Sequence, residues 1–280
     1  MSFLKKLFIL VILFFLVYGG YRYYKHTHPQ YIPPPVRAEV TLTIIPGWNL
    51  RQVAEYLVLK GFATSSDEVF AITGVPGEIS KTDILLEPFD SQLQSTLESR
   101  PRTLSYEGYL APQTFRVFAD APVSDVIGKF LVERDQYFTS EGVLPDIFSG
   151  HHTVHQILTM ASIIEKETKR NEDRPLVADI LWRRLKRGMA LQVDSSVHYA
   201  IDKIGDVYTT DKEREIDSPW NTYKYPGLPP GPICNPSLDS IKAALNPTAN
   251  DYWYFLSDKD GVIHYAKTLD EQNANRVKYL

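Results

Sequence analysis

The sequence predicts an α+β protein with a single helix at its N-terminus for crossing a membrane. Three observations support this prediction. A continuous apolar run lies near the start of the chain. It is followed by a short segment in which apolar and polar residues alternate, and then by two short amphipathic helices. Beyond these, longer helical stretches alternate with short strands and loops. The chain has 280 residues, 44% of them hydrophobic, which is enough for one large or two modest domains with their own cores.

The apolar run from Leu7 to Tyr21 predicts a transmembrane anchor within the first 22 residues. The run itself is uncharged, Lys5 and Lys6 precede it, and Arg22 and Lys25 follow it. A cleaved signal peptide is the alternative, but no small-x-small cleavage site follows the apolar core. The positive charge before the run, including the amino terminus, favours a cytoplasmic N-terminus with the rest of the chain outside.

Residues 23–36 end in a proline-rich stretch and predict a stiff, extended linker. Residues 37–77 predict a small module. In the segment from Ala38 to Ile45, apolar and polar residues alternate, which predicts a strand. Asn49 and Gln52 then form a capping box for the first of two short helices. This order resembles a LysM-like module, a fold that often binds N-acetylglucosamine in cell-wall glycans. A generic strand-helix-helix packing unit fits the same residues.

Residues 78–280 predict one larger α+β domain. Helical periodicity marks residues 123–138, 153–168 and 174–187, and Gly188 is a typical C-terminal cap for the last of these helices. Residues 252–266 predict a β-hairpin, because two strand-like runs flank a polar turn that contains a glycine.

Composition argues against several classes of function. The net charge is −4 and basic residues do not cluster outside the N-terminus, so we expect no nucleic-acid partner. Cys234 is the only cysteine, which rules out an internal disulfide and any cysteine-based zinc spacing. His151, His152 and His155 lack acidic or cysteine partners nearby in sequence, so we expect neither a metal nor another cofactor.

Glu165 is the main candidate for catalysis. In a helix over residues 154–168 it projects to the same side as Leu158 and Ala161, whereas Glu167 is expected to face solvent. A carboxyl group held against apolar walls has a raised pKa and can serve as a general acid. The alternative is an ordinary helix-end glutamate paired with a lysine four residues later.

Three blocks occur in a characteristic order. The first is Tyr106 to Phe115 (YEGYLAPQTF), and the second combines Ala161 to Glu167 (ASIIEKE) with Leu191 to Asp194 (LQVD). The third combines Ser218 to Tyr223 (SPWNTY) with Gly227 to Pro236 (GLPPGPICNP). In order and spacing they closely resemble the YceG-like family of endolytic murein transglycosylases. The resemblance covers nearly the whole chain. The chain departs from the usual family pattern at Gln113, Phe115 and Trp220. These departures affect the expected contacts with substrate, but they leave Glu165 and therefore the expected reaction unchanged.

The resemblance implies a lytic transglycosylase in which Glu165 is the catalytic acid. Such an enzyme protonates the glycosidic oxygen between N-acetylmuramic acid and N-acetylglucosamine. The same carboxylate then helps the muramoyl C6 hydroxyl to close a 1,6-anhydro ring, so a second catalytic carboxylate is not needed. Amide, hydroxyl, aromatic and acidic side chains of the motif regions are the expected substrate-binding groups. They are Glu107, Tyr109, Gln192, Asp194, Tyr199, Asn221, Thr222, Tyr223 and Asn235.

Each of these binding residues has a structural alternative, which is to hold a turn, cap a helix or pin the proline-stiffened loop. The overall hypothesis is a single-pass protein of the bacterial cytoplasmic membrane. It would cut nascent peptidoglycan strands outside the cytoplasm, near the glycan-polymerising machinery, and thereby end strand elongation. The alternatives are a non-catalytic, membrane-anchored peptidoglycan-binding scaffold and a glycoside hydrolase with Asp194 as its second carboxylate.

Overall fold

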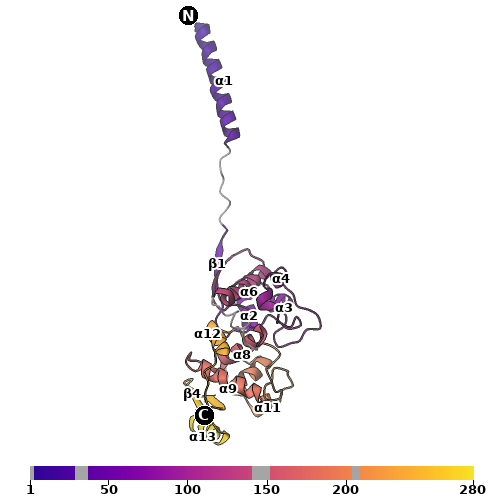
Figure 1. The fold of residues 1–280 in the computed structure, drawn as a ribbon. Helices are drawn as coiled ribbons and strands as arrows, with labels where there is room; N and C mark the ends of the chain where they lie inside the picture. Colours follow the sequence, from indigo (N-terminus) through magenta and orange to yellow (C-terminus); the bar gives the residue numbers. More distant parts are fainter. Residues whose placement is uncertain (1–2, 29–36, 141–151, 204–208) are drawn as a thin grey trace. The chain divides into compact units, whose positions relative to one another are not determined.

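The computed structural model describes residues 3–28, 37–140, 152–203 and 209–280, and the chain divides into two units, Met1–Ala38 and Glu39–Leu280. The first unit contains helix α1 (Phe3–Thr27), shown at the N-terminus in Figure 1. Residues Lys5–Thr27 are long and apolar enough to cross a bilayer. The helix therefore continues through residues 23–27, which the sequence assigned to the linker, and linker residues 29–36 lie outside the described residues.

The second unit begins with a strand that pairs far along the chain. Strand β1 (Glu39–Thr43) is antiparallel to β2 (Thr114–Phe118), with Leu42 opposite Phe115. Both of these side chains are buried, Leu42 completely, so the pairing places one face of this small sheet on the main core. The first strand of the expected module thus pairs with a strand from the region expected to form the larger domain.

Two short helices follow β1 as predicted. Helix α2 (Leu50–Leu59) begins with the predicted capping box between Asn49 and Gln52, and it buries Leu50, Val53, Ala54 and Leu57. Helix α3 (Ser66–Thr73) is capped by Ser65. These elements fit a strand-helix-helix unit, but a LysM-like identity for it stays a prediction.

The core is built around α8 (Val154–Glu167), whose residues from Val154 to Ile164 are all buried except Gln156. Helices α9 (Arg174–Lys186) and α12 (Leu238–Leu245) pack against it, and Figure 1 shows α12 beside α8. The predicted hairpin is present as β3 (Tyr254–Ser257) and β4 (Ile263–Ala266). The remaining helices are α4 (Phe89–Gln92), α5 (Gln94–Leu97), α6 (Val123–Ser140), α10 (Asp194–Ala200), α11 (Asp211–Arg214) and α13 (Leu269–Tyr279).

Helix α10 was not among the helices that periodicity predicted. Residues 189–193 have no helical structure, and Asp194 is the first residue of α10. This short helix packs against α8. As a result, the N-terminal end of α10 lies beside the C-terminal end of α8, where the candidate site is found.

Candidate active site

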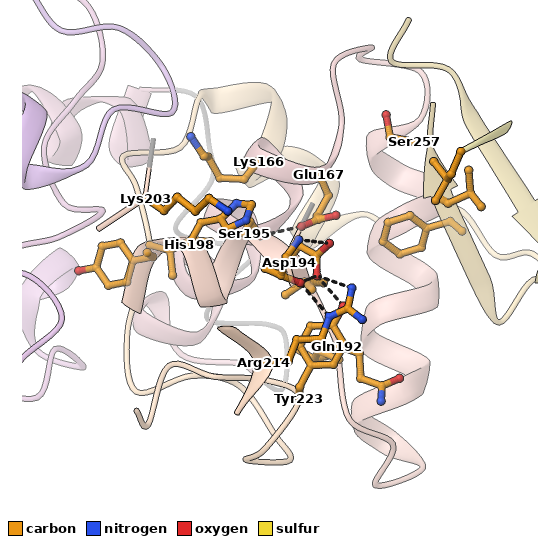
Figure 2. A pocket seen from close by; sticks show the side chains of 18 of the residues that line it. Lys166, Glu167, Gln192, Asp194, Ser195, His198, Lys203, Arg214, Tyr223 and Ser257 are labelled. Carbon is orange, nitrogen blue, oxygen red and sulfur yellow. Dashed lines mark hydrogen bonds and ion pairs between the residues drawn. The ribbon is translucent and has the colours of Figure 1, made fainter. Parts of the chain in front are cut away.

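A cleft of about 1300 Å³ lies in the second unit (Figure 2). Its lining comes from the C-terminal end of α8, from α10 and α11, from the β3–β4 hairpin and from α13. Most of the lining side chains are polar or charged, and Tyr199, Tyr223, Tyr254 and Phe255 add aromatic surface. Such a groove suits an extended polar ligand with apolar ring faces.

Glu167, the last residue of α8, is the glutamate that lines this cleft. Burial raises its pKa to about 7, and the nearby negative charge of Asp194 raises it too. Ser195 Oγ donates a hydrogen bond of 2.6 Å to its carboxylate. The expectation that Glu167 faces solvent is therefore wrong, because α10 covers the end of α8 at this position.

Glu165 is buried as predicted, with 8% of its side chain exposed, but its surroundings are polar. Its carboxylate accepts hydrogen bonds from the Ser237 amide (3.0 Å), the Ser237 hydroxyl (2.5 Å) and the Ser240 hydroxyl (2.6 Å). Arg174 Nη2 lies 3.4 Å from its other oxygen. Helical periodicity predicted apolar walls around this carboxylate, but among the described residues the N-terminus of α12 faces it. Glu165 is not among the residues that line the cleft.

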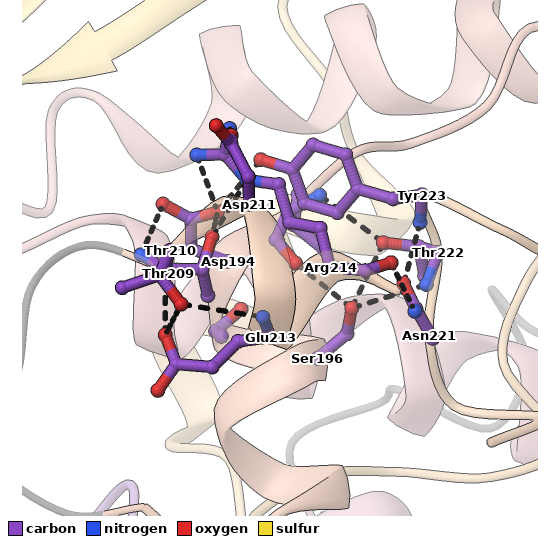
Figure 3. Close-up of polar contacts among 12 residues, drawn as sticks. Asp194, Ser196, Thr209, Thr210, Asp211, Glu213, Arg214, Asn221, Thr222 and Tyr223 are labelled. Atoms are coloured by element: carbon purple, nitrogen blue, oxygen red, sulfur yellow. Dashed lines mark hydrogen bonds and ion pairs between the residues drawn. The ribbon is translucent and has the colours of Figure 1, made fainter. Parts of the chain in front are cut away.

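Asp194 is a second carboxylate in the cleft and lies close to Glu167 in Figure 2. It accepts hydrogen bonds from Thr209 Oγ1 (2.5 Å) and Tyr223 OH (2.6 Å), and Arg214 Nη2 lies 3.6 Å away. Figure 3 shows these groups converging on its side chain.

Gln192, Asp194, Tyr199 and Tyr223 are the expected binding residues that the cleft brings together. Tyr199 is 5% exposed, and its hydroxyl donates to Glu107 at 3.2 Å. Gln192 is exposed and has a positive φ of 52°. Of these four, Gln192 and Asp194 place polar groups on the cleft surface, whereas the phenol groups of the two tyrosines are engaged by carboxylates.

The other expected binding residues are buried and lie outside the lining of the cleft. Asn221 donates to two main-chain carbonyls, Thr222 Oγ1 accepts the Val193 amide at 3.1 Å, and Asn235 bridges Leu110 and Trp48. The Tyr109 hydroxyl pairs with His155 Nδ1 at 2.9 Å. These four side chains hold loops in place, which is the structural alternative considered for them from sequence.

Glu107 is also buried and connects α2 to α10. Both of its oxygens accept the Leu50 amide, at 3.1 and 3.0 Å, and one also accepts the Tyr199 hydroxyl. Burial raises its pKa to about 7. Glu107 therefore occupies the N-terminus of α2, where the helix dipole favours an acidic group.

The proline-rich loop at residues 227–236 packs into the protein and contributes only Ile233 to the lining of the cleft. Ser162 on α8 accepts the Ile233 amide at 3.0 Å. Buried Arg134 donates to the carbonyls of Leu110 and Pro236. The loop contacts α8 and contributes little to the wall of the groove, and its rigidity stays a prediction.

Several cleft residues had no recognisable signal in the sequence. Ser195, Thr209 and Arg214 lie in segments without a repeating pattern, and α13 reads as an ordinary polar helix. Within the described ranges, no group of three His, Cys, Asp or Glu side chains is placed to hold a metal ion. His155 is engaged by Tyr109 and the Pro230 carbonyl, and His151 lies outside the described residues.

A buried carboxyl group with a pKa near neutrality, beside a second carboxylate in a polar cleft, is an arrangement typical of proteins that act on glycosidic bonds. The chain belongs to the YceG-like family, whose model matches residues 15–278.

Two curated relatives are named endolytic murein transglycosylase. The one from Bacillus subtilis (strain 168) is 35% identical over 247 residues, covering 85% of this chain and 65% of the relative. The one from Streptococcus pneumoniae serotype 2 (strain D39) is 32% identical over 257 residues, covering 86% of this chain and 44% of the relative. This chain thus spans less than two thirds of the length of either relative.

The fold is also similar to that of a crystallised YceG-like protein from Listeria monocytogenes. The TM-score is 0.70 at 32% sequence identity, and the match covers 85% of this chain and 75% of the other. The mixed α and β architecture is therefore one already observed within the family.

Proposed function

We propose that this chain is an endolytic transglycosylase that cleaves the bond between N-acetylmuramic acid and N-acetylglucosamine within peptidoglycan strands. The observation that carries the proposal is Glu167, a carboxyl group in the cleft with a pKa of about 7. A group with this pKa is protonated in a large fraction of molecules at neutral pH, so it can serve as an acid and then as a base. The names of the curated relatives support the same reaction and substrate.

In the proposed reaction, Glu167 donates its proton to the glycosidic oxygen as the bond from that oxygen to the muramoyl C1 breaks. The N-acetylglucosamine unit leaves with a free 4-hydroxyl group. The positive charge at C1 is shared with the neighbouring N-acetyl group. The Glu167 carboxylate then removes the proton of the C6 hydroxyl as its oxygen bonds to C1, which forms the 1,6-anhydro ring and restores the acid.

The surroundings of the two glutamates favour Glu167 over Glu165 as the acid. Three hydrogen-bond donors and a guanidinium surround Glu165, which lies outside the lining of the cleft. We propose that Glu165 has a positioning role, because it ties the end of α8 to the start of α12. Glu165, the acid that the family resemblance suggested, is the rival assignment.

Asp194 supports a second candidate reaction, ordinary hydrolysis. It lies in the same cleft as Glu167 and could activate a water molecule as the second carboxylate of a hydrolase site. Hydrolysis would leave reducing muramic acid ends in place of anhydro rings. In the transglycosylase reaction, by contrast, Asp194 has only an electrostatic role, which is to raise the pKa of Glu167.

Mass spectrometry of uncrosslinked glycan strands incubated with the detergent-solubilised full chain tests these assignments. We expect internal fragments with 1,6-anhydromuramic acid ends, and Glu167→Gln should lower the rate roughly 100-fold to 10,000-fold. Glu165→Gln should retain much more activity once its folding is verified. A larger loss of activity in Glu165→Gln than in Glu167→Gln would identify Glu165 as the acid. Products with reducing ends that are absent with Asp194→Asn would identify a hydrolase.

Helix α1 also supports a location at the membrane, where new strands are made. We propose a single-pass anchor with the second unit outside the cytoplasm, close to the glycan-polymerising machinery, where cutting would end strand elongation. A non-catalytic scaffold that binds peptidoglycan is the alternative from another class of function. Strands that stay intact but bind both the parent chain and Glu167→Gln would favour the scaffold.

A further inference from the structure

The charged side chains of the cleft fall into two groups. Among the described residues, each carboxylate of the lining has a hydrogen-bond or ion-pair partner, as shown by Glu167 with Ser195, Asp202 with Arg51 and Asp258 with His264. Asp194 and Asp211 both pair with Arg214. Five cationic side chains of the lining have no carboxylate within ion-pair distance in the described part of the chain. One of them, Arg184, is buried and donates to the carbonyls of Trp253 and Leu191, whereas the other four are exposed. These four, Lys166, Lys169, Lys259 and Arg276, are called the cationic rim below.

The residues of the cationic rim come from different elements of the cleft that contains Glu167. Lys166 directly precedes Glu167 on α8, and its positive charge lowers the pKa of Glu167. Lys259 lies in the turn of the β3–β4 hairpin, and Arg276 lies on α13, which packs against that hairpin. All four side chains are exposed, so a ligand in the cleft can reach them without rearrangement of the fold.

Two of these lysine side chains lie close to glycines. Lys166 Nζ lies 3.4 Å from the carbonyl oxygen of Gly47, and a Cβ atom built at Gly47 would come within 4.0 Å of the Lys166 side chain. At Gly261 in the hairpin turn, such a Cβ would lie 2.3 Å from Lys169 Cδ, with φ at +78°. The Lys169 side chain therefore crosses closely over the turn that contains Lys259, which gathers positive charge at this end of the cleft.

We propose that the cationic rim binds the carboxylates of the peptides attached to muramic acid, so that peptide-bearing strands are the preferred substrate. This inference rests on the proposed function for the class of ligand. In a peptide-bearing strand the sugar backbone is neutral, because each lactyl group is linked to its peptide by an amide bond. The negative charge is on the peptides, which are beside the backbone, and the four cations of the rim, in the same cleft as the acid, complement this arrangement.

A binding experiment tests the proposal with two forms of one substrate. Uncrosslinked strands are N-acetylated on their peptide amines. The sample is then divided, and in one portion the peptide carboxylates are converted to amides. The full chain carrying Glu167→Gln is used for binding, so that no strand is cut during the measurement. We expect the carboxylate form to bind roughly fivefold more tightly than the amide form, with the preference decreasing as salt is added.

Adding Lys169→Met and Lys259→Met together should bring the ratio of the two affinities close to one. The matched control is Lys278→Met, because Lys278 lies on the same helix as Arg276 but outside the cleft lining. Restoring charge with Lys169→Arg and Lys259→Arg should restore the preference. The proposal would be overturned if the chain carrying Glu167→Gln alone bound the two strand forms equally. It would also be overturned if the added lysine substitutions lowered the affinity for both forms by the same factor.

The outcome also separates this inference from the proposed function. If the active chain cuts neither form of the strand, the proposed function fails. A preference for carboxylates that depends on Lys169 and Lys259 would then still identify the cationic rim as an anion-binding site.

Discussion

At the residue scale, the cleft shows how two glutamates of one motif acquire different chemistry. Glu165 and Glu167 are two positions apart on α8, but the N-terminus of α12 faces the first and the N-terminus of α10 covers the second. Donors surround Glu165, whereas burial and the charge of Asp194 raise the pKa of Glu167 to about 7. Helical periodicity predicts a direction for each side chain but not the element that it meets.

The pH dependence of strand cleavage should follow Glu167. Since the protonated form donates the proton, the rate should fall about tenfold per pH unit above a pKa of about 7. Asp194→Asn removes a negative charge that raises this pKa, so the descending limb should move to lower pH. Initial rates of strand cleavage from pH 5 to 9 measure both effects. A limb that stays in place in Asp194→Asn would contradict the coupling of the two groups.

Glu107 should make stability depend on pH. Its pKa is about 7 in the folded protein against 4.5 for the unperturbed group, so the folded state binds more protons between these values. The free energy of unfolding should therefore fall as pH rises through this window, by up to about 3 kcal/mol. Urea unfolding at pH 5 and pH 8 measures the fall. Glu107→Gln should reduce it, and an unchanged fall would show that Glu107 does not titrate in this range.

At the scale of elements, most helices follow from local sequence, whereas their contacts do not. The capping box of α2 and the hairpin β3–β4 were predictable, because their signals lie within a few residues. The partner of β1 was not, since β2 is about 70 residues further along the chain. Helix α10 was missed because its seven residues, beginning at Asp194, are too few for a periodic pattern.

Ser237 should be important for the junction of α8 and α12. Its hydroxyl caps α12 by accepting the Ser240 amide, and it also donates to Glu165 at 2.5 Å. Ser237→Ala should lower the free energy of unfolding by about 1 to 3 kcal/mol, since it removes a cap and leaves a buried carboxylate with one donor fewer.

Ser65→Ala is the matched control for this prediction, because Ser65 caps α3 without contacting a buried acid. Its cost should be about 1 kcal/mol or less. Urea unfolding of the two variants beside the parent gives the comparison. Equal costs would show that the Ser237 contact with Glu165 adds nothing to stability.

At the scale of the whole molecule, the chain combines an apolar helix with one compact unit from Glu39 to Leu280. The apolar run, the α+β class and the family motifs could be recognised from the sequence because each is continuous along the chain. The cleft could not, because its lining combines the end of α8 with α10, the hairpin and α13. Such a lining depends on tertiary packing between segments that are separated by up to about 230 residues, from Asn49 to Leu280.

The two units predict separable roles for membrane attachment and strand cleavage. A chain without residues 1–38 should fold, because the described part of the second unit contains the buried core and the lining of the cleft. It should cut soluble strands at nearly the parent rate and stay in the supernatant after ultracentrifugation of membranes. The full chain should sediment with membranes, since burying a helix of this apolarity in a bilayer is strongly favourable. If the full chain were instead released after cleavage near α1, the apolar run would be a signal peptide.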